Sequence, residues 1–80
     1  MTLDKLDIGN FCRVKSVNTD ELIRRRLLDI GLIPNTLVSC LYKSPLGSLK
    51  AYLIRDSVIA IRSYDASKIE VDVLWLILVW

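Results

Sequence analysis

The chain has 80 residues and a formal net charge of +2, from eleven Lys and Arg against nine Asp and Glu. This length accommodates one domain, and a hydrophobic share of 52% with only three Gly and two Pro excludes a disordered chain. The small net charge provides no electrostatic drive toward nucleic acid or anionic lipid.

Histidine is absent, so the chain lacks the most common general base near neutral pH and the most common ligand of zinc, copper and iron. Its two cysteines, Cys12 and Cys40, cannot supply the four ligands of a structural zinc site. They also fall short of the cysteine density of a small secreted domain. We therefore expect two free, buried thiols in a reducing compartment, no bound metal and no cofactor.

The N-terminal part of the chain is expected to hold a helical turn, a strand and a helix. Thr2 can cap a turn over residues 3–6, and the β-branched and aromatic run 11–17 predicts a strand. A helix then begins after Thr19 or Asp20, either of which can serve as N-cap. Its apolar stripe comprises Leu22, Ile23, Leu27 and Ile30. Gly31 fits the left-handed position that ends such a helix, which predicts a positive φ.

The remainder of the chain has the two-residue period of strands. Strands are predicted over residues 36–43, 48–55, 58–62 and 69–73. The segment 44–47 has Pro at its second and Gly at its fourth position, as type I turns prefer. One helical turn over residues 63–68, capped by Ser63 or Asp65, precedes the last strand. The order predicts a mainly β fold, a small and partly open β-barrel with one inserted α-helix.

The apolar phase of each element predicts the core of this barrel. The predicted core residues are Val14, Leu27, Ile30, Leu37, Leu41, Leu49, Leu53, Ile59, Ile61, Ile69 and Val71.

No motif for catalysis is present. A Ser-His-Asp or Cys-His arrangement needs a histidine, and glycines at positions 9, 31 and 47 alone cannot form a nucleophile elbow or a phosphate-binding loop. The carboxylates of Asp20 and Glu21 are explained by helix capping. We therefore expect a binding protein rather than an enzyme.

Arg24, Arg25 and Arg26 form the densest charge cluster and have two interpretations. They can bind an anion or a partner, or they can be a solvated helix face paired with acidic residues four positions away. Consecutive helical residues point about 100° apart, so the three side chains cannot form one patch.

The segment 26–36 also looks like a helix-turn-helix, with a helix, a glycine turn and a capped restart. A DNA-binding unit would need a recognition helix next, and the strand-like segment 36–43 offers one Lys. No nucleic-acid partner is expected on this ground.

Three motifs occur in an order that is typical of one protein family. Residues 24–36 read Arg-Arg-Arg-Leu-Leu-Asp-Ile-Gly-Leu-Ile-Pro-Asn-Thr. This run resembles the R-R-L-x-x-[LM]-G-[LI]-x-P-G-[TS] signature of the ferrous iron transport protein A (FeoA) family. Residues 43–48 resemble its P-L-G hairpin, and residues 59–71 its ending. The similarity runs from about Leu3 to Val71. One departure lies within it, since Asn35 replaces the family's glycine, and Asn tolerates the left-handed conformation.

The resemblance implies an SH3-like β-barrel with an inserted helix. It also implies a small cytoplasmic accessory protein, at the inner face of the cell membrane, that binds and modulates the membrane ferrous iron transporter FeoB. The same domain type resembles the C-terminal module of iron-dependent repressors. The alternative function is therefore that of an SH3-like or helix-turn-helix module acting in metal-dependent transcription regulation.

Partner contacts are predicted on the helix and at the hairpin tip. The candidate residues are Arg24, Arg25 and Arg26 in part, together with Pro45, Leu46 and Gly47. An exposed Leu46 would be unusual in a turn, because turns prefer polar residues. The alternative is that Leu46 folds back to cover one end of the barrel.

Beyond the predicted domain, residues 1–72, eight apolar residues form a C-terminal tail, residues 73–80. As a strand, the tail would reach roughly 26 Å and have two apolar faces. So large an apolar segment indicates an interface, and self-association into a homo-oligomer is predicted. The alternatives are a segment that touches a membrane or the transporter, the start of a membrane-spanning chain, and an extension that folds back over its own barrel. The predicted self-association residues are Leu74, Trp75, Leu76, Leu78 and Trp80.

Overall fold

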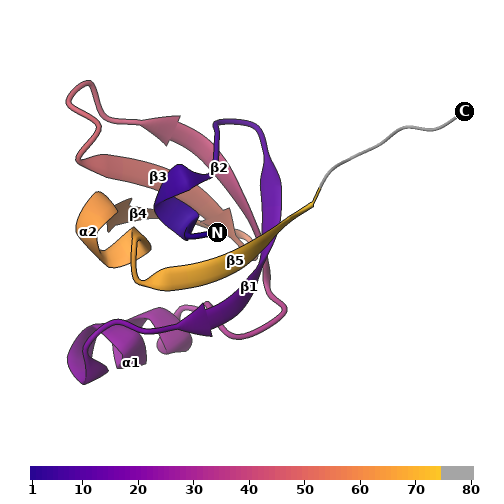
Figure 1. Ribbon diagram of the computed structural model, residues 1–80, viewed down its shortest axis with the longest axis vertical. Helices are drawn as coiled ribbons and strands as arrows, with labels where there is room; N and C mark the ends of the chain where they lie inside the picture. Colours follow the sequence, from indigo (N-terminus) through magenta and orange to yellow (C-terminus); the bar gives the residue numbers. More distant parts are fainter. Residues whose placement is uncertain (75–80) are drawn as a thin grey trace, which may run out of the picture.

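A computed structural model describes residues 1–74, which form one curled, five-stranded antiparallel sheet with helices around it (Figure 1). The strand order is β4-β3-β2-β1-β5. Along the chain, the elements are η1 (Leu3–Lys5), β1 (Phe11–Val17), α1 (Glu21–Asp29), β2 (Leu37–Lys43), β3 (Leu49–Ile54), β4 (Ser57–Arg62), α2 (Ser63–Ala66) and β5 (Ile69–Leu74). The prediction of a mainly β fold with one inserted helix is confirmed.

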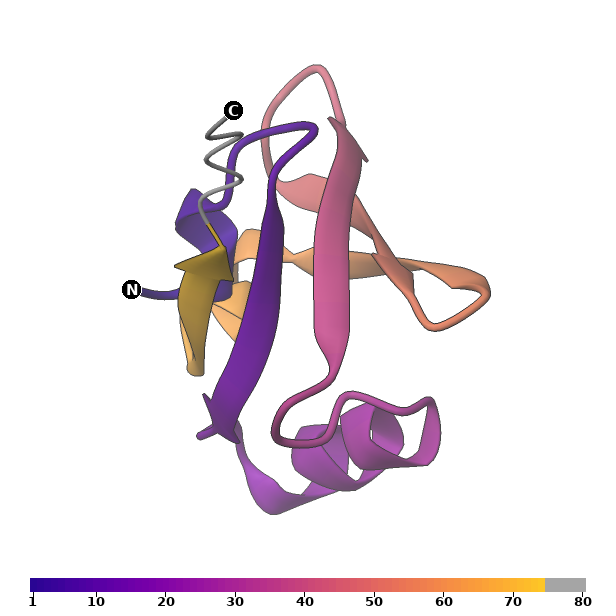
Figure 2. The ribbon, with the colours of Figure 1, turned by 90° about the vertical axis from the view of Figure 1, so that its right-hand side faces the viewer.

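The sheet is a partly open barrel because its two edge strands, β4 and β5, do not pair with each other within residues 1–74. Helix α1 lies at one end of the molecule, and the loop between β2 and β3 lies at the opposite end (Figures 1 and 2). The N-terminal residues pair with the free edge of β5, since Thr2 forms an isolated β-bridge with Glu70 and Val71 N donates to Met1 O at 2.8 Å.

The core differs in part from the predicted one. Val14, Leu27, Ile61, Ile69 and Val71 are buried as predicted. The buried apolar residues that the pattern missed are Leu3, Leu6, Leu32, Val38, Ala51, Tyr52, Ile54 and Ala66, whereas Cys12 and Cys40 are buried as expected. The predicted core residues that instead stay exposed are Ile30, Leu37, Leu41, Leu49 and Leu53, and Ile59 is only partly buried.

In β3, the face with Tyr52 and Ile54 is inside instead of the face with Leu49 and Leu53. The Tyr52 hydroxyl donates to Leu3 O at 3.2 Å, so this ring can be buried with its polar atom satisfied. On the same side, Lys50 Nζ donates to carbonyl oxygens at the end of η1, that of Asp4 at 2.6 Å and that of Leu6 at 3.0 Å. The 3-10 turn thus fixes the phase of a strand far along the chain.

In β2, the side that faces the core is the opposite of the predicted one. Val38 and Cys40 pair in register with Ile54 and Tyr52 and are buried with them. Side chains alternate along a strand, so Leu37 and Leu41 lie on the outer side, where Leu41 is 37% exposed. The prediction that Leu41 is a core residue is wrong for this reason. The register with β3 shifts after Cys40, so Leu41 is also the extra residue of a bulge.

The segment after α1 is a strand, not a recognition helix. Gly31 ends the helix with φ +105°, as predicted, and Asn35 adopts φ 73° in the loop before β2. The helix-turn-helix alternative is therefore wrong. The predicted caps of α2 are also wrong: Arg62 precedes α2, Ser63 Oγ donates to Gly47 O at 2.8 Å, and Asp65 pairs with Arg62.

Candidate functional site

Helix α1 is fixed at its two ends and by one side only. At its start, Asp20 Oδ1 accepts a hydrogen bond from Ile23 N at 3.0 Å, as an N-cap does. Past its end, Leu32 N donates to Leu27 O at 2.9 Å, and both of these leucines are buried. The exposed apolar residue Leu22 lies outside this contact. The helix therefore rests on the sheet through a narrow stripe and leaves space beside it.

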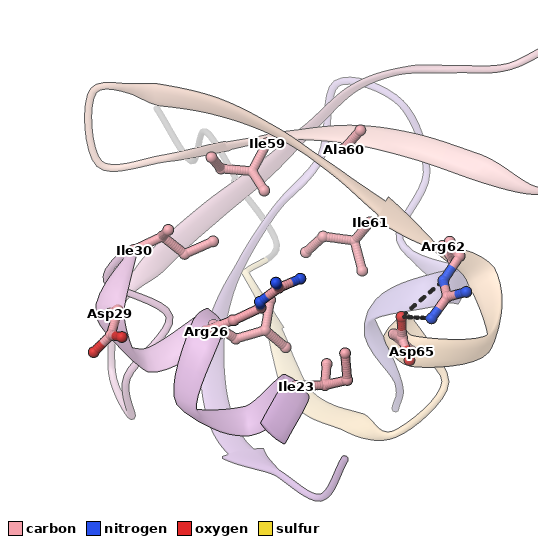
Figure 3. Close-up of a pocket in the computed structure, with 10 residues that line it drawn as sticks. Ile23, Arg26, Asp29, Ile30, Ile59, Ala60, Ile61, Arg62 and Asp65 are labelled. Atoms are coloured by element: carbon pink, nitrogen blue, oxygen red, sulfur yellow. Dashed lines mark hydrogen bonds and ion pairs between the residues drawn. The ribbon is translucent and has the colours of Figure 1, made fainter. Parts of the chain in front are cut away.

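That space is a groove of about 700 Å³ between α1 and β4 (Figure 3). Its lining comes from two segments that are far apart in the sequence, α1 on one side and β4 with the adjoining α2 on the other. The lining residues are Ile23, Arg26, Leu27 and Asp29 of α1, its C-cap residue Ile30, Ile59, Ala60, Ile61 and Arg62 of β4, and Asp65 of α2.

The walls of the groove are apolar and its rim is charged. Ile23 and Ile59 pack partly buried against the core, and Ile30 is exposed toward the open side. On the rim, Arg62 forms a 3.1 Å ion pair with Asp65. Arg26 is exposed and takes part in no ion pair within residues 1–74. A guanidinium beside an apolar surface can bind a carboxylate of a partner.

The groove runs along an edge strand. Strand β4 pairs only with β3 among the described strands, so its other side carries backbone groups without a strand partner. Such an edge can accept a further strand by main-chain hydrogen bonds, with side chains entering adjacent pockets. The arrangement can therefore hold an extended apolar segment that carries an acidic residue.

The three arginines of the cluster are distributed around α1. Arg26 lines the groove, whereas Arg25 lies in a separate shallow depression with Glu21 and Leu22. Arg24 is exposed and belongs to neither surface. The expected pairs with acidic residues four positions away do not form, because the ion pairs of residues 1–74 are Met1–Glu70 and Arg62–Asp65.

The hairpin tip lies at the end of the molecule opposite α1 (Figures 1 and 2), and none of its residues lines the groove. Its turn is closed by Gly47 N, which donates to Ser44 O at 2.9 Å. Leu46 is 93% exposed. The alternative that this leucine folds back to cover the barrel is therefore wrong. Of the predicted contact residues, the groove contains Arg26, and the tip contains Pro45, Leu46 and Gly47.

Sequence reasoning missed the β4 side of the groove. Ile30 and Ile59 were expected in the core, because an apolar phase does not distinguish a core from a groove. Ile61 is in the core as predicted and also lines the groove. The spacing of three residues between Arg62 and Asp65 is typical of an ion pair at the start of a helix, so this pair could have been predicted from the sequence. Nothing in the sequence indicated that β4 would be an edge strand next to α1.

The two cysteines lie away from the groove. Cys12 and Cys40 are both free and buried, as predicted. Burial, with a smaller contribution from the nearby Cys40, raises the pKa of Cys12 to about 11. Burial likewise raises the pKa of Cys40. Both thiols are thus protonated near neutral pH, which disfavours nucleophilic or metal-ligating roles.

Within residues 1–74, no group of three or more Cys, Asp or Glu side chains is placed to hold a metal ion. No helix of this part of the chain has the length and hydropathy of a membrane span.

Comparison with protein families gives a match to the FeoA domain over residues 1–73. The chain belongs to the FeoA family. This family is associated with ferrous iron transport, as an accessory domain.

Solved FeoA structures have the same fold. The FeoA protein of Chlorobium tepidum is 31% identical, with a TM-score of 0.90, over 94% of this chain and 71% of that one. Iron(II) transport protein A of Clostridium thermocellum is 27% identical, with a TM-score of 0.87, over 92% of this chain and 46% of that one. This FeoA chain thus spans less than half of the Clostridium protein.

FeoA of Stenotrophomonas maltophilia was solved as a complex with zinc and is described as an SH3 domain protein. It is 28% identical, with a TM-score of 0.80, over 90% of this chain and 89% of that one. The expected SH3-like barrel is therefore confirmed. A manganese-dependent transcriptional repressor matches with a TM-score of 0.80 at 19% identity, which shows a shared fold alone. The comparison with curated proteins gave no match.

Proposed function

We propose that this FeoA-family chain is a cytoplasmic accessory protein that binds a FeoB-type ferrous iron transporter at the inner face of the membrane and modulates its transport. The groove between α1 and β4 is the main contact. The observation that carries the proposal is Arg26, an exposed guanidinium without an ion pair in residues 1–74, beside an apolar groove along an edge strand. The chain acts by binding, without catalysis and without nucleic acid.

The groove suits an extended segment from the cytoplasmic part of the transporter. Backbone groups of that segment would pair with the free side of β4, and alternate apolar side chains would lie against Ile30 and Ile59. A carboxylate on the same segment would face Arg26. Each of these contacts uses groups that the isolated chain leaves accessible.

The hairpin tip is proposed as a second contact. Leu46 at 93% exposure adds nothing to the core, and loops commonly carry binding residues. A transporter domain much larger than this chain could reach both the groove and the tip.

Calorimetric titration of the cytoplasmic part of the transporter with the full chain tests the groove. Arg26→Glu should weaken binding by about tenfold or more, since it places a carboxylate opposite the partner's own. Lys15→Glu makes the same charge change on an exposed position of β1, outside the groove, and should leave the affinity nearly unchanged. Equal affinity of the Arg26 variant and the wild type would refute the proposed contact.

Titration with duplex DNA at low salt distinguishes transporter binding from the alternative function in transcription regulation. A DNA-binding protein would bind tightly there and lose affinity steeply as salt rises. We expect no such binding, because the net charge is +2 and the segment after α1 is β2.

A further inference from the structure

The outer face of the sheet carries an apolar hollow. It is lined by Phe11, Leu37, Ser39, Leu53 and Arg55, from three neighbouring strands and the turn after them. We call these five residues the outer hollow. Ser39 is only 5% exposed although it lies on this outer side, because the larger side chains around it cover it. In Figure 2, β5, β1 and β2 face the viewer and no helix lies in front of them.

The first two residues of the C-terminal tail, Val73 and Leu74, belong to β5, and Leu74 lies at the edge of this outer hollow. Leu74, the last residue of β5, is the cross-strand partner of Phe11. Phe11 pairs in turn with Ser39, and Ser39 with Leu53. These four residues therefore form one row across β5, β1, β2 and β3, and residues 75–80 of the tail follow directly on the end of that row.

The tail has the composition of a segment that is stabilised by packing against an apolar surface. Residues 75–80, which lie outside the described residues, read Trp-Leu-Ile-Leu-Val-Trp and carry no charge. Six extended residues span roughly 20 Å, more than the roughly 14 Å that three strand spacings need. The tail is thus long enough to cross an outer hollow.

We infer that the tail of one copy covers the outer hollow of a second copy, so that two chains exchange tails in a homodimer. A second copy is needed because the tail lacks turn-forming residues. Residues 73–80 contain no Gly, Pro, Asn, Asp or Ser, so the sequence provides no turn that would bring the tail back onto its own sheet. A tail that continues straight from β5 moves away from its own hollow. Two-fold symmetry then gives each hollow one tail.

The area is sufficient for a stable dimer. An aromatic side chain buries roughly 150–250 Å², so the four Trp residues of two exchanged tails bury on the order of 600–1,000 Å². The leucine, isoleucine and valine residues and the covered hollows bring the total into the range of about 1,200–2,000 Å² found for specific complexes. This inference concerns a surface separate from the groove, so it does not depend on transporter binding.

Three matched Leu→Lys variants of the full chain test the exchange by sedimentation over a range of concentrations. The wild type should dimerise. Leu53→Lys in the outer hollow and Leu76→Lys in the tail should each raise the dimer dissociation constant by about tenfold or more. Leu22→Lys, at an exposed position of α1 outside the hollow, should dimerise like the wild type.

Intrinsic fluorescence gives an independent readout, because the only Trp residues of the chain are Trp75 and Trp80. Their emission should shift to shorter wavelength as the protein concentration rises, and Leu53→Lys should abolish this shift. If circular dichroism shows that Leu53→Lys is unfolded, Leu37→Lys replaces it.

Two results would overturn the inference. A monomeric wild type with blue, concentration-independent emission would mean that the tail covers its own hollow. A dimer that persists in a folded Leu53→Lys or Leu37→Lys variant would mean that the interface lies elsewhere.

Discussion

The side chain of Arg55 lies against the α-carbon of Gly31, so closely that a Cβ at position 31 would be 2.7 Å from Arg55 Nε and 2.9 Å from Cδ. This contact joins the turn between β3 and β4 to the end of α1. Gly31 also has φ +105°, a conformation that side-chain-bearing residues rarely adopt. Position 31 thus needs glycine for its backbone conformation, and a Cβ there would also force the Arg55 side chain to shift.

Gly31→Ala should destabilise the fold, and a second substitution separates the two reasons. Chemical denaturation should give a loss of roughly 1–3 kcal/mol for the single variant, because strain at such a φ is costly. Adding Arg55→Ala removes the close contact and should restore part of the loss, while the backbone strain remains. A double variant that is no more stable than Gly31→Ala would show that the contact with Arg55 carries no cost.

The outward position of Leu41 in β2 predicts that truncation of this side chain is tolerated. Leu41→Ala should lower the free energy of unfolding by less than about 1 kcal/mol, because Leu41 stays exposed. Ile54→Ala should lower it by about 2–5 kcal/mol, because Ile54 is fully buried. Urea denaturation of both variants measures the difference, and an equal loss would contradict the phase seen in β2 and β3.

Asn35 occupies the left-handed region with φ 73°, where the family pattern has glycine. Asn35→Gly should stabilise the fold by up to about 1 kcal/mol, because glycine adopts this region without the penalty of a Cβ. Thermal unfolding should show a higher midpoint. A lower midpoint would mean that the extra freedom of glycine in the unfolded chain outweighs the relief.

Stability should fall at high pH through the buried thiols. The pKa of Cys12 rises from about 8.5 in an unfolded chain to about 11 in the fold. This contribution is fully present below the unfolded pKa and is lost as pH rises through the folded pKa. Denaturation measured over this range should show a weaker pH dependence for Cys12→Ala than for the wild type. Identical slopes would contradict the raised pKa.

Leu46→Asp tests the hairpin tip. Thermal stability should stay within about 0.5 kcal/mol of the wild type, because Leu46 makes almost no contact with the rest of the chain. Affinity for the cytoplasmic part of the transporter should fall. Unchanged affinity in a folded variant would restrict the partner surface to the groove.

Element boundaries followed from local chemistry and were well predicted. The run from Phe11 to Val17 is one strand, as its β-branched and aromatic residues indicated, and Asp20 caps α1 as an N-cap residue should. Gly31 ends α1 for the same local reason. These features depend on residues within a few positions of one another, so the sequence contains them directly.

Which side chains of β2 and β3 point into the core could not be predicted, because contacts between residues far apart in the sequence decide it. Tyr52 enters the core since its hydroxyl reaches Leu3 O, 49 positions away. In β2, the run is apolar on both sides, so nothing local shows which side faces the core. For the same reason the groove escaped prediction: only the folded sheet brings β4 beside α1, and Arg26 beside Ile59.

The hydrogen bond from Val71 N to Met1 O holds the start of the chain beside β5, the last strand. Val71 and Leu74 are three residues apart, so an extended linker of roughly 10 Å would join the end of β5 to Met1. A circular permutant could therefore be closed there and opened at the exposed turn of Leu46, with every strand pairing retained. The same geometry would allow the barrel to be inserted into a surface loop of a larger protein, entering and leaving at nearly one point.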